Sequence, residues 1–417
     1  MTRTRPRLAF ISPVFLFPND AGGKIRTTNI LRGMKGGAFD ITLVSVVSSE
    51  QRLKWAAEID GVCDTFIGWE PAAPKPKWRR SLDLLHTLPV NIVSDRTAAG
   101  LEAIARITAR TDIDLFVFDF VHAAVLRPHS IRCPSICFTH NVEAEIFARH
   151  AKRATNPLMR KMWSLQYQKM HEFERTELQR FDTVIAVSER DAVAFRNAYD
   201  IKSVCAIPTG VDLDFFAYQA PPDVTAAVPP TVVFTGSMDW AANIDGVQFF
   251  LREVWPLVLA DCKDARFVMV GRNPPASLQT LVRESRQVQL TGFVDDIRPY
   301  VHAAHVFVIP LLVGGGTRIK AFEAMAMGCP VVSTSIGIEG LDATEEVDYL
   351  RRDGATSIAA GILELFQNGE LRSKLAENAR RLVEERFGHR VAAQAFEQIC
   401  LQTLEKCDSP KNNVSGM

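Results

Sequence analysis

Short apolar runs alternate with stretches of helical periodicity, and this alternation constrains the fold more than any other feature of the sequence. The runs in the first half of the chain are Leu8–Ser12, Ile41–Val47, Thr65–Ile67, Leu115–Phe118, Ser135–Phe138 and Thr183–Val187. Stretches with helical spacing lie between several of them, such as Thr27–Met34 and Ala98–Ala109. Strands that alternate with helices run parallel, because each helix carries the chain back across the sheet. The first half therefore predicts a parallel sheet.

The same pattern starts again after a segment rich in Pro and Ala at 217–230. The apolar runs there are Thr231–Thr235, Arg266–Gly271, Val288–Leu290, Val306–Pro310 and Val331–Thr334. A chain of 417 residues also exceeds what one hydrophobic core usually supports. The predicted fold class is α/β, with two Rossmann-like, doubly wound parallel-sheet domains that face each other across a cleft. The predicted boundaries are 1–207 for the N-terminal domain, 208–229 for a turn and linker, 230–386 for the C-terminal domain, 387–406 for a final helix and 407–417 for a loose tail.

Charge and cysteine content exclude several classes of protein. The chain has 48 Lys and Arg against 48 Asp and Glu, which is not the charge of a nucleic-acid-binding protein. The eight cysteines form no CxxC pair and are predicted to be free thiols of a reducing compartment. No run is apolar and long enough to span a bilayer, and Pro13 and Pro18 interrupt the run that follows Arg3, Arg5 and Arg7. We expect a cytoplasmic protein.

The segment Gly314–Pro330 carries the strongest functional signal. Three glycines follow a predicted strand and precede a helix expected at Ala321–Met327. Gly316 and Thr317 would let a ligand approach the backbone at the helix start, where unpaired N–H groups bind anions. Arg318 and Lys320 add two positive charges, and Glu323 lies on the same helical face as Lys320, where its carboxylate can accept from sugar hydroxyls. This pattern predicts a site for a diphosphate and a ribose; the alternative is a Gly-rich turn whose cations only solvate a helix start.

Two segments of the first half are further candidates. The sequence Thr139-His140-Asn141-Val142-Glu143 follows a predicted strand, where parallel sheets bind ligands. His140 is either a structural histidine or a residue of the cleft, and Glu143 is either its helper or a charge at a helix start. Gly22 and Gly23, with Lys24 and Arg26, precede a helix expected from Thr27. This loop either contacts phosphates or an anionic acceptor, or is a plain strand-to-helix loop with Thr27 as the cap.

The first half also carries most of the positive charge, with 29 basic and 22 acidic side chains in residues 1–205. Basic and apolar residues alternate over Arg149–Arg180, and Lys75–Arg80 forms a second basic patch around Trp78. A basic amphipathic helix can lie on an anionic membrane surface. The alternative is a solvated face whose apolar stripe packs into the core.

These motifs resemble those of retaining glycosyltransferases of the GT-B fold, family 4 type. The resemblance is carried by Gly314–Pro330, Ile207–Asp212, Leu290–Ile297, Val184–Ser188 and Gly22-Gly23, which occur in the family's order from about residue 8 to residue 400. It implies transfer of a sugar from a nucleoside-diphosphate sugar to a hydroxyl of a growing or lipid-linked glycan, with retention and without an obligatory metal or other cofactor. It further implies that Gly23, Gly292, Gly316, Thr317, Arg318, Lys320 and Glu323 bind the donor and that His140 is catalytic, with Gly22, Arg26 and Glu143 as contacts of the acceptor or of phosphate.

The sequence departs from the family pattern at two points. Gly315 stands where the family usually has the first Glu of a Glu-x7-Glu motif, and Gly236–Trp240 replaces its usual Gly-Arg…Lys phosphate clamp. Arg318 and Lys320 would then have to supply the clamp's charge. Two alternatives stay open: another GT-B enzyme, such as a nucleotide-sugar epimerase, and a non-catalytic nucleotide-sugar-binding protein. A membrane-peripheral location is a further expectation, while the sugar, base, acceptor, linkage and oligomeric state are not predicted.

Overall fold

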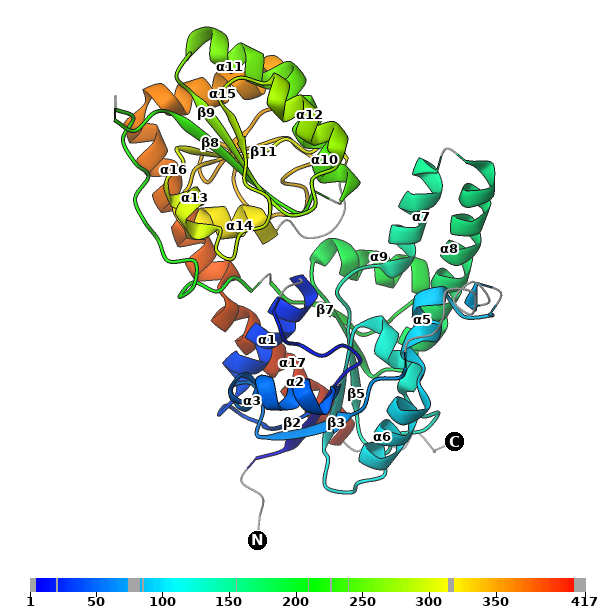
Figure 1. Ribbon diagram of the computed structural model, residues 1–417. Coiled ribbons are helices and arrows are strands. Elements are labelled where there is room, and N and C mark those ends of the chain that lie inside the picture. Colours follow the sequence, from blue (N-terminus) through cyan, green and yellow to red (C-terminus); the bar gives the residue numbers. More distant parts are fainter. Residues whose placement is uncertain are drawn as a thin grey trace, which may run out of the picture. The chain divides into compact units, whose positions relative to one another are not determined.

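The chain forms two compact units, each built on one parallel β-sheet (Figure 1). The computed structural model describes residues 5–19, 22–73, 83–84, 86–154, 156–208, 210–225, 227–238, 240–313 and 319–408. The first unit comprises Met1–Gly210 together with His389–Met417, and the second comprises Val211–Gly388. The sequence analysis ends its first domain at 207 and assigns 208–229 to a linker; in the structure, residues from Val211 onwards group with the second unit.

Seven parallel strands form the sheet of the first unit, in the order β3-β2-β1-β4-β5-β6-β7. The strands are β1 (Arg7–Ser12), β2 (Asp40–Val46), β3 (Thr65–Trp69), β4 (Leu115–Asp119), β5 (Ser135–Phe138), β6 (Thr183–Ala186) and β7 (Val204–Ala206). Alternate residues of each strand face opposite sides, so that Leu8 and Phe10 belong to one apolar cluster and Ala9 and Ile11 to another. Burial on both faces explains the nearly continuous apolar runs of the sequence.

Helices cover both faces of this sheet. They are α1 (Gly22–Met34), α2 (Ser49–Lys54), α3 (Ala56–Asp60), α5 (Val90–Asp95), α6 (Ala98–Thr108), the 3₁₀ helix η1 (Val121–Leu126), α7 (Glu143–Arg153), α8 (Pro157–Leu178), α9 (Glu189–Tyr199) and α17 (His389–Asp408). The last of these returns from the end of the chain and packs on α1, with Ala393, Phe396 and Cys400 in the apolar cluster beneath. The predicted final helix is therefore a structural part of the first unit.

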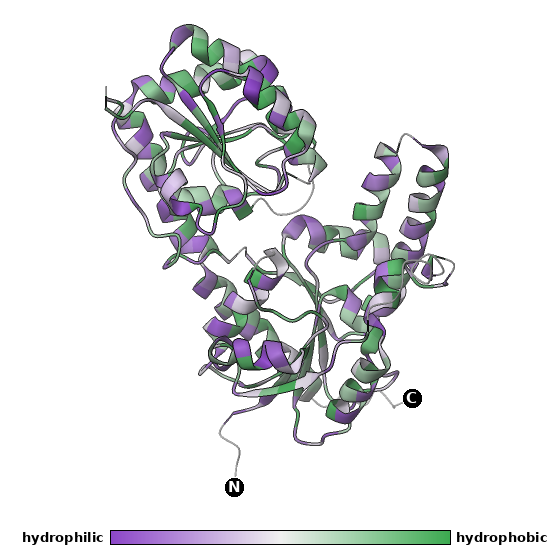
Figure 2. Ribbon diagram, viewed as in Figure 1, coloured by the Kyte–Doolittle hydropathy of each residue, from purple (hydrophilic) through white to green (hydrophobic). Residues whose placement is uncertain are grey.

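Six parallel strands form the sheet of the second unit, in the order β10-β9-β8-β11-β12-β13. The strands are β8 (Thr231–Thr235), β9 (Arg266–Val270), β10 (Val288–Leu290), β11 (Val306–Ile309), β12 (Val331–Ser333) and β13 (Leu350–Arg351). The helices are α10 (Ala241–Phe249), the π-helix η2 (Phe250–Val254), α11 (Trp255–Asp261), α12 (Ala276–Glu284), α13 (Arg298–His302), α14 (Ile319–Ala326), α15 (Ala355–Gln367), α16 (Gly369–Leu382) and the π-helix η3 (Val383–Phe387). Figure 2 shows mainly apolar residues on the strands of each unit and both polar and apolar residues on the helices around them.

The order of strands fixes where each unit can bind a ligand. In the first sheet the order reverses between β1 and β4, and in the second between β8 and β11. The connections on either side of such a point leave to opposite faces, which opens a crevice at the carboxyl ends of the two strands. None of the helices in the described ranges combines the length and hydropathy that a membrane-spanning helix requires.

Candidate functional site

Polar side chains gather at the carboxyl ends of β1, β4 and β5, where the order of the first sheet reverses. Ser12 ends β1, Asp119 ends β4, and His140 follows β5 by two residues. All three are buried. Because burying a polar group is costly unless it is hydrogen-bonded, the partners of these side chains matter for the stability of the unit.

The carboxylate of Asp119 is the centre of this cluster. It accepts hydrogen bonds from Nε2 of His140 at 2.8 Å, from the Ser12 hydroxyl at 2.9 Å and from the Thr27 hydroxyl at 3.1 Å. Its side chain has no exposed surface. One buried carboxylate therefore joins β1, β4, α1 and the segment after β5. The sequence analysis missed it, although an acidic residue at the end of the apolar run Leu115–Phe118 was the available signal.

His140 is buried rather than open to solvent, since its side chain is 2% exposed. Its ring stacks on that of Phe120, with the ring centroids 3.9 Å apart. Burial lowers the pKa of His140, and the Asp119 carboxylate only partly opposes this. The imidazole is therefore neutral at pH 7; with the proton on Nε2 facing Asp119, Nδ1 carries a lone pair. Nδ1 is buried and has no hydrogen-bond partner within the described part of the chain, so its acceptor capacity is unused there.

The prediction that a helix begins at Thr27 is wrong, because α1 already begins at Gly22. Thr27 lies inside the helix and donates to Asp119 instead of capping the helix. Gly22 and Gly23 gave no signal for a helix start in the sequence, because glycine is a poor helix former. A Cβ atom at Gly23 would lie 2.6 Å from the Phe120 ring and 3.5 Å from Nδ1 of His140. Glycine thus lets the first turn of α1 approach the stacked rings closely.

Arg26, one turn into α1, is a buried cation. Burial lowers its pKa to about 10, and the carboxylates of Asp191 and Asp119 partly offset the effect. Its Nε and Nη2 atoms are buried and find no hydrogen-bond partner among the residues that the structure describes. A guanidinium with unsatisfied donors near the start of a helix has the chemistry of an anion-binding group.

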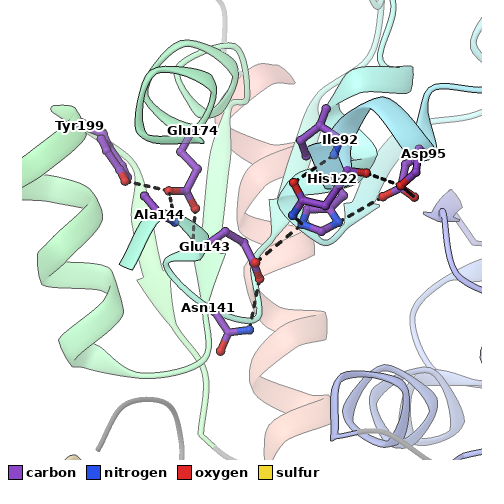
Figure 3. A network of polar contacts seen from close by, with 10 residues as sticks. Ile92, Asp95, His122, Asn141, Glu143, Ala144, Glu174 and Tyr199 are labelled. Atoms are coloured by element: carbon purple, nitrogen blue, oxygen red, sulfur yellow. Dashed lines mark hydrogen bonds and ion pairs between the residues drawn. The ribbon is translucent and has the colours of Figure 1, made fainter. Parts of the chain in front are cut away.

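Glu143 is the first residue of α7 and belongs to a second polar network, drawn in Figure 3. Its Oε1 accepts from Nδ2 of Asn141 at 3.3 Å, and its Oε2 lies 3.7 Å from Nε2 of His122. Burial alone would raise the pKa of Glu143, but the contacts with His122 and Asn141 outweigh it and the pKa is lowered. The side chain is therefore an anion at neutral pH, and 14% of it is exposed.

In the second unit, Lys320 lies over the end of β8. Its Nζ donates to Oδ1 of Asn243 at 3.0 Å and lies 4.4 Å from the centroid of the Phe234 ring. A Cβ atom at Gly236 would lie 2.7 Å from this Nζ. The predicted Gly316, Thr317 and Arg318 fall in 314–318, outside the described residues.

Three glycines bring the ends of β8, β9 and β10 together. The N–H of Gly271 donates to the carbonyl of Gly292 at 3.1 Å, and a Cβ atom at Gly271 would lie only 1.9 Å from the Gly236 carbonyl oxygen. Gly292 adopts φ = 75°, a conformation that favours glycine. Glu323, on α14, has its pKa raised to about 7 by burial, against the opposing effect of the Lys320 charge.

Arg272 is a second cation at this edge, and the sequence analysis missed it. Its side chain is exposed, and its Nε donates to the Ser237 hydroxyl at 3.3 Å. The Ser237 carbonyl accepts from Nδ2 of Asn243 at 2.8 Å, and the same amide binds Lys320 through its oxygen. Arg272 and Lys320 are therefore linked through two residues, Ser237 and Asn243. The available signal was the position of Arg272 directly after a predicted strand.

Comparison with protein families gives two matches. A model described as "Glycosyltransferase Family 4" matches residues 70–215, and one described as "Glycosyl transferases group 1" matches residues 229–368. Together they cover about two thirds of the chain.

Curated relatives match parts of the chain at 25% and 29% identity. A D-inositol 3-phosphate glycosyltransferase of Xylanimonas cellulosilytica is 25% identical over 244 residues, which are 54% of this chain and 58% of the relative. A phosphatidyl-myo-inositol mannosyltransferase of Mycobacterium tuberculosis is 29% identical over 185 residues, 40% of this chain and 46% of the relative. The matched part spans about half the length of these relatives.

Solved structures with the same fold cover nearly the whole chain. Sucrose-phosphate synthase from Thermosynechococcus elongatus superimposes with a TM-score of 0.68 at 17% identity, over 96% of this chain and 100% of that one. The Anabaena protein HepE, solved in complex with UDP, gives a TM-score of 0.64 at 14% identity, over 95% and 100% of the two chains. At these identities the likeness shows the fold, two Rossmann-like domains of the GT-B type.

The central place of Asp119 predicts a stability difference between two substitutions. Asp119→Ala leaves the donors of Thr27 and His140 without this acceptor, while the Ser12 hydroxyl keeps the Val14 carbonyl at 2.9 Å. The substitution is expected to lower the free energy of unfolding by about 3 kcal/mol. Asp119→Asn keeps one carbonyl oxygen and should lose less. Denaturant unfolding measures both, with the exposed Asp60→Ala as a control expected to change stability by less than about 0.5 kcal/mol. Equal stability of Asp119→Ala and the unmodified protein would contradict the role of Asp119.

Proposed function

The chain belongs to the family 4 glycosyltransferases, and from that membership we propose that it transfers a sugar from a nucleoside-diphosphate sugar to a hydroxyl group of a glycan or lipid-linked acceptor. The reaction retains the configuration of the sugar and needs no bound metal. Nucleoside diphosphate leaves, so that catalysis depends on positioning the reactants and on stabilising the negative charge that develops on the phosphates.

The observation that carries this proposal is the linked pair of cations at the carboxyl ends of β8 and β9. Lys320 and Arg272 are linked through Asn243 and Ser237, beside glycines that let the ends of β8 and β9 pack closely. Together with Gly316, Thr317 and Arg318 they bind the diphosphate, and Glu323 binds the ribose. Arg272 then supplies positive charge that is missing because Gly236–Trp240 stands in place of the family's phosphate clamp.

The first unit contributes groups suited to the sugar and the acceptor. Nδ1 of His140, buried and without a partner in the described ranges, accepts a hydrogen bond from a hydroxyl of the transferred sugar. Gly22, Gly23 and Arg26 contact phosphate or an anionic acceptor, and Glu143 contacts the acceptor. The binding of UDP by HepE supports a uridine nucleotide as the first donor to test.

The proposal predicts release of nucleoside diphosphate that depends on an acceptor. UDP- and GDP-sugars are offered with octyl glycosides of glucose, galactose and mannose, and release is followed with and without EDTA. Turnover should survive EDTA, and His140→Ala should lower it by about 10²-fold or more while changing UDP affinity less than about threefold. His129→Ala, at an exposed histidine, is the control.

The outcomes separate the alternatives. Donor hydrolysis that ignores the acceptor would favour an epimerase-like enzyme, and binding of donor without turnover with any acceptor would favour a binding protein. Activity lost in EDTA and restored by Mg²⁺ or Mn²⁺ would contradict metal independence. Inversion of the anomeric configuration, read by NMR of the product, would contradict retention.

The two linked cations predict a specific loss of nucleotide affinity. Lys320→Ala and Arg272→Ala should each weaken UDP binding by about 1.5–3 kcal/mol, the range of a charge-assisted hydrogen bond. Arg266→Ala is the matched control, because Arg266 is exposed at the opposite end of the strand that Arg272 follows. If calorimetry finds that UDP binds Lys320→Ala and Arg272→Ala as tightly as it binds the control, the diphosphate does not bind at this edge.

A membrane surface is the second partner that we propose. Helices α7 and α8 run side by side as a hairpin (Figure 1), and the first turn of α8 exposes Leu158, Met159, Arg160 and Lys161. The predicted apolar stripe is divided: Met170 and Phe173 are buried, whereas Leu158 and Leu165 are 75% and 46% exposed. Exposed apolar side chains among lysines and arginines favour an anionic lipid surface. The second predicted patch, Lys75–Arg80, lies outside the described residues.

Membrane contact predicts binding to anionic vesicles. The protein should sediment with phosphatidylglycerol vesicles and much less with phosphatidylcholine vesicles, and Leu158→Glu should reduce the bound fraction severalfold. Leu53→Glu is the control, since Leu53 on α2 is 81% exposed but lies away from the hairpin in the sequence. Equal binding of both variants would assign the contact to another surface.

A further inference from the structure

The network around His122 converges on Glu143 from two sides. His122 follows β4 by three residues and Glu143 opens α7 after β5, so both lie at the edge of the sheet that holds Asp119 and His140. Nδ1 of His122 lies 3.1 Å from Oδ2 of Asp95, at the end of α5, while its Nε2 faces Oε2 of Glu143 at 3.7 Å. Figure 3 shows the imidazole between the two carboxylates.

The backbone of Glu143 is held separately, by Glu174 on α8. The fully buried Glu174 accepts from the N–H of Glu143 at 2.7 Å through one oxygen, and from the N–H of Ala144 at 3.1 Å through the other. The Tyr199 hydroxyl donates to the second oxygen at 2.7 Å. These contacts satisfy the first N–H groups of α7 and fix where the Glu143 side chain leaves the helix.

Charge explains why the imidazole suits this position. Burial by itself would lower the pKa of His122, but Asp95 and Glu143, the carboxylates that face it from α5 and α7, outweigh burial and raise the pKa to about 9. At neutral pH both ring nitrogens therefore carry protons. The Nδ1 proton is within hydrogen-bond distance of Asp95, whereas Nε2 and Glu143 are at ion-pair distance. Nε2 also lies 3.1 Å from Nδ2 of Asn91, whose Oδ1 accepts from the Ile92 N–H at 3.1 Å. A protonated Nε2 therefore requires the Asn91 side chain to turn its Nδ2 away from the ring.

Stability alone does not explain the place of this pair at the ligand-binding edge of the sheet. Desolvating two charges offsets much of the free energy that their attraction returns, so that an ion pair in the interior is weak evidence for a purely stabilising role. The pair instead leaves one carboxylate, 14% exposed, with acceptor capacity that Asn141 and His122 do not use up. Glu143 also interacts electrostatically with His140.

We propose that His122 is a positioning residue: its imidazolium, anchored by Asp95, holds the carboxylate of Glu143 where that carboxylate accepts hydrogen bonds from the hydroxyl groups of the acceptor. The inference rests on the proposed function, since it assigns the acceptor to this carboxylate. It also assigns separate tasks to the two histidines, because neutral His140 offers a lone pair and charged His122 offers two N–H donors.

The experiment follows KM and kcat as a function of pH for the octyl glycoside that gives the highest turnover in the acceptor screen. In the unmodified protein the acceptor KM should rise above about pH 9, as His122 loses its proton, while the donor KM stays constant. Asp95→Asn removes one carboxylate and should move this rise to lower pH by about one unit or more. His122→Gln should raise the acceptor KM about tenfold at every pH, and His129→Gln should change nothing.

A merely structural role would not give this pattern. It would lower kcat for all variants in proportion to misfolded protein and leave the pH at which the acceptor KM rises unchanged in Asp95→Asn. An acceptor KM that is constant up to pH 10, or unchanged in both Asp95→Asn and His122→Gln, overturns the proposal even when transfer itself is confirmed.

A titration by NMR keeps the test independent of catalysis. Histidine labelled with ¹³C is titrated in the full chain, and the His122 signal is assigned by its loss in His122→Gln. A His122 pKa near 9 that falls in Asp95→Asn supports the ion pairing of His122 with Asp95 and Glu143, including in a protein that shows no transfer. A His122 pKa near the ordinary 6.5 overturns it. Because the pKa of His122 is raised on folding, its protonation stabilises the folded unit. This contribution is complete below about pH 6.5 and is lost as the pH rises through about 9.

Discussion

A single buried carboxylate organises the ligand-binding edge of the first unit. Asp119 ends the central strand β4 and receives donors from β1, from α1 and from the segment that follows β5. A parallel sheet aligns the ends of its strands but leaves the loops beyond them free to diverge. The shared acceptor makes their positions interdependent, because Thr27 and His140 would lose the Asp119 carboxylate if their segments moved away. It also fixes the proton of His140 on Nε2 and thereby leaves Nδ1 as the acceptor.

The positions of the strands were largely predictable, because burial on both faces gives continuous apolar runs. Ser135–Phe138, Thr231–Thr235 and Val288–Leu290 have the predicted bounds, and the other predicted strands differ by one or two residues. The strands β7 and β13 were missed, and the two residues of β13 are too few to produce a periodic signal. The start of α1 was missed because Gly22 and Gly23 are poor helix formers, and their close approach to Phe120 is a tertiary constraint.

The residues of the candidate site were predictable only as positions in the sequence. His140, Glu143 and Lys320 follow or lie near predicted strands, and this placed them at an edge where ligands bind. Their partners come from distant segments: Asp119 for His140, His122 and Glu174 for Glu143, Asn243 for Lys320. A sequence without its fold contains no signal for such pairs. The protonation states depend on these partners too, which is why the two histidines of one edge have pKa values shifted in opposite directions.

The charges of the two units differ in a way that matches two kinds of ligand group. In the second unit, the side chain of Arg272 is exposed, and Lys320 is only partly buried beside glycines, as suits a multiply charged diphosphate that brings its own counter-charge. In the first unit, the ionisable groups near β4 and β5 are buried or partly buried and mostly matched: Asp119 with three donors, His122 with two carboxylates, Glu174 with two N–H groups and a hydroxyl. A site of balanced charges gives directional hydrogen bonds without a strong net field, and this suits the neutral hydroxyl groups of sugars. Arg26 departs from this balance, because two of its donors lack a partner in the described chain. If an anionic group enters the first unit, its place is therefore the start of α1, where the helix N–H groups add to the same charge.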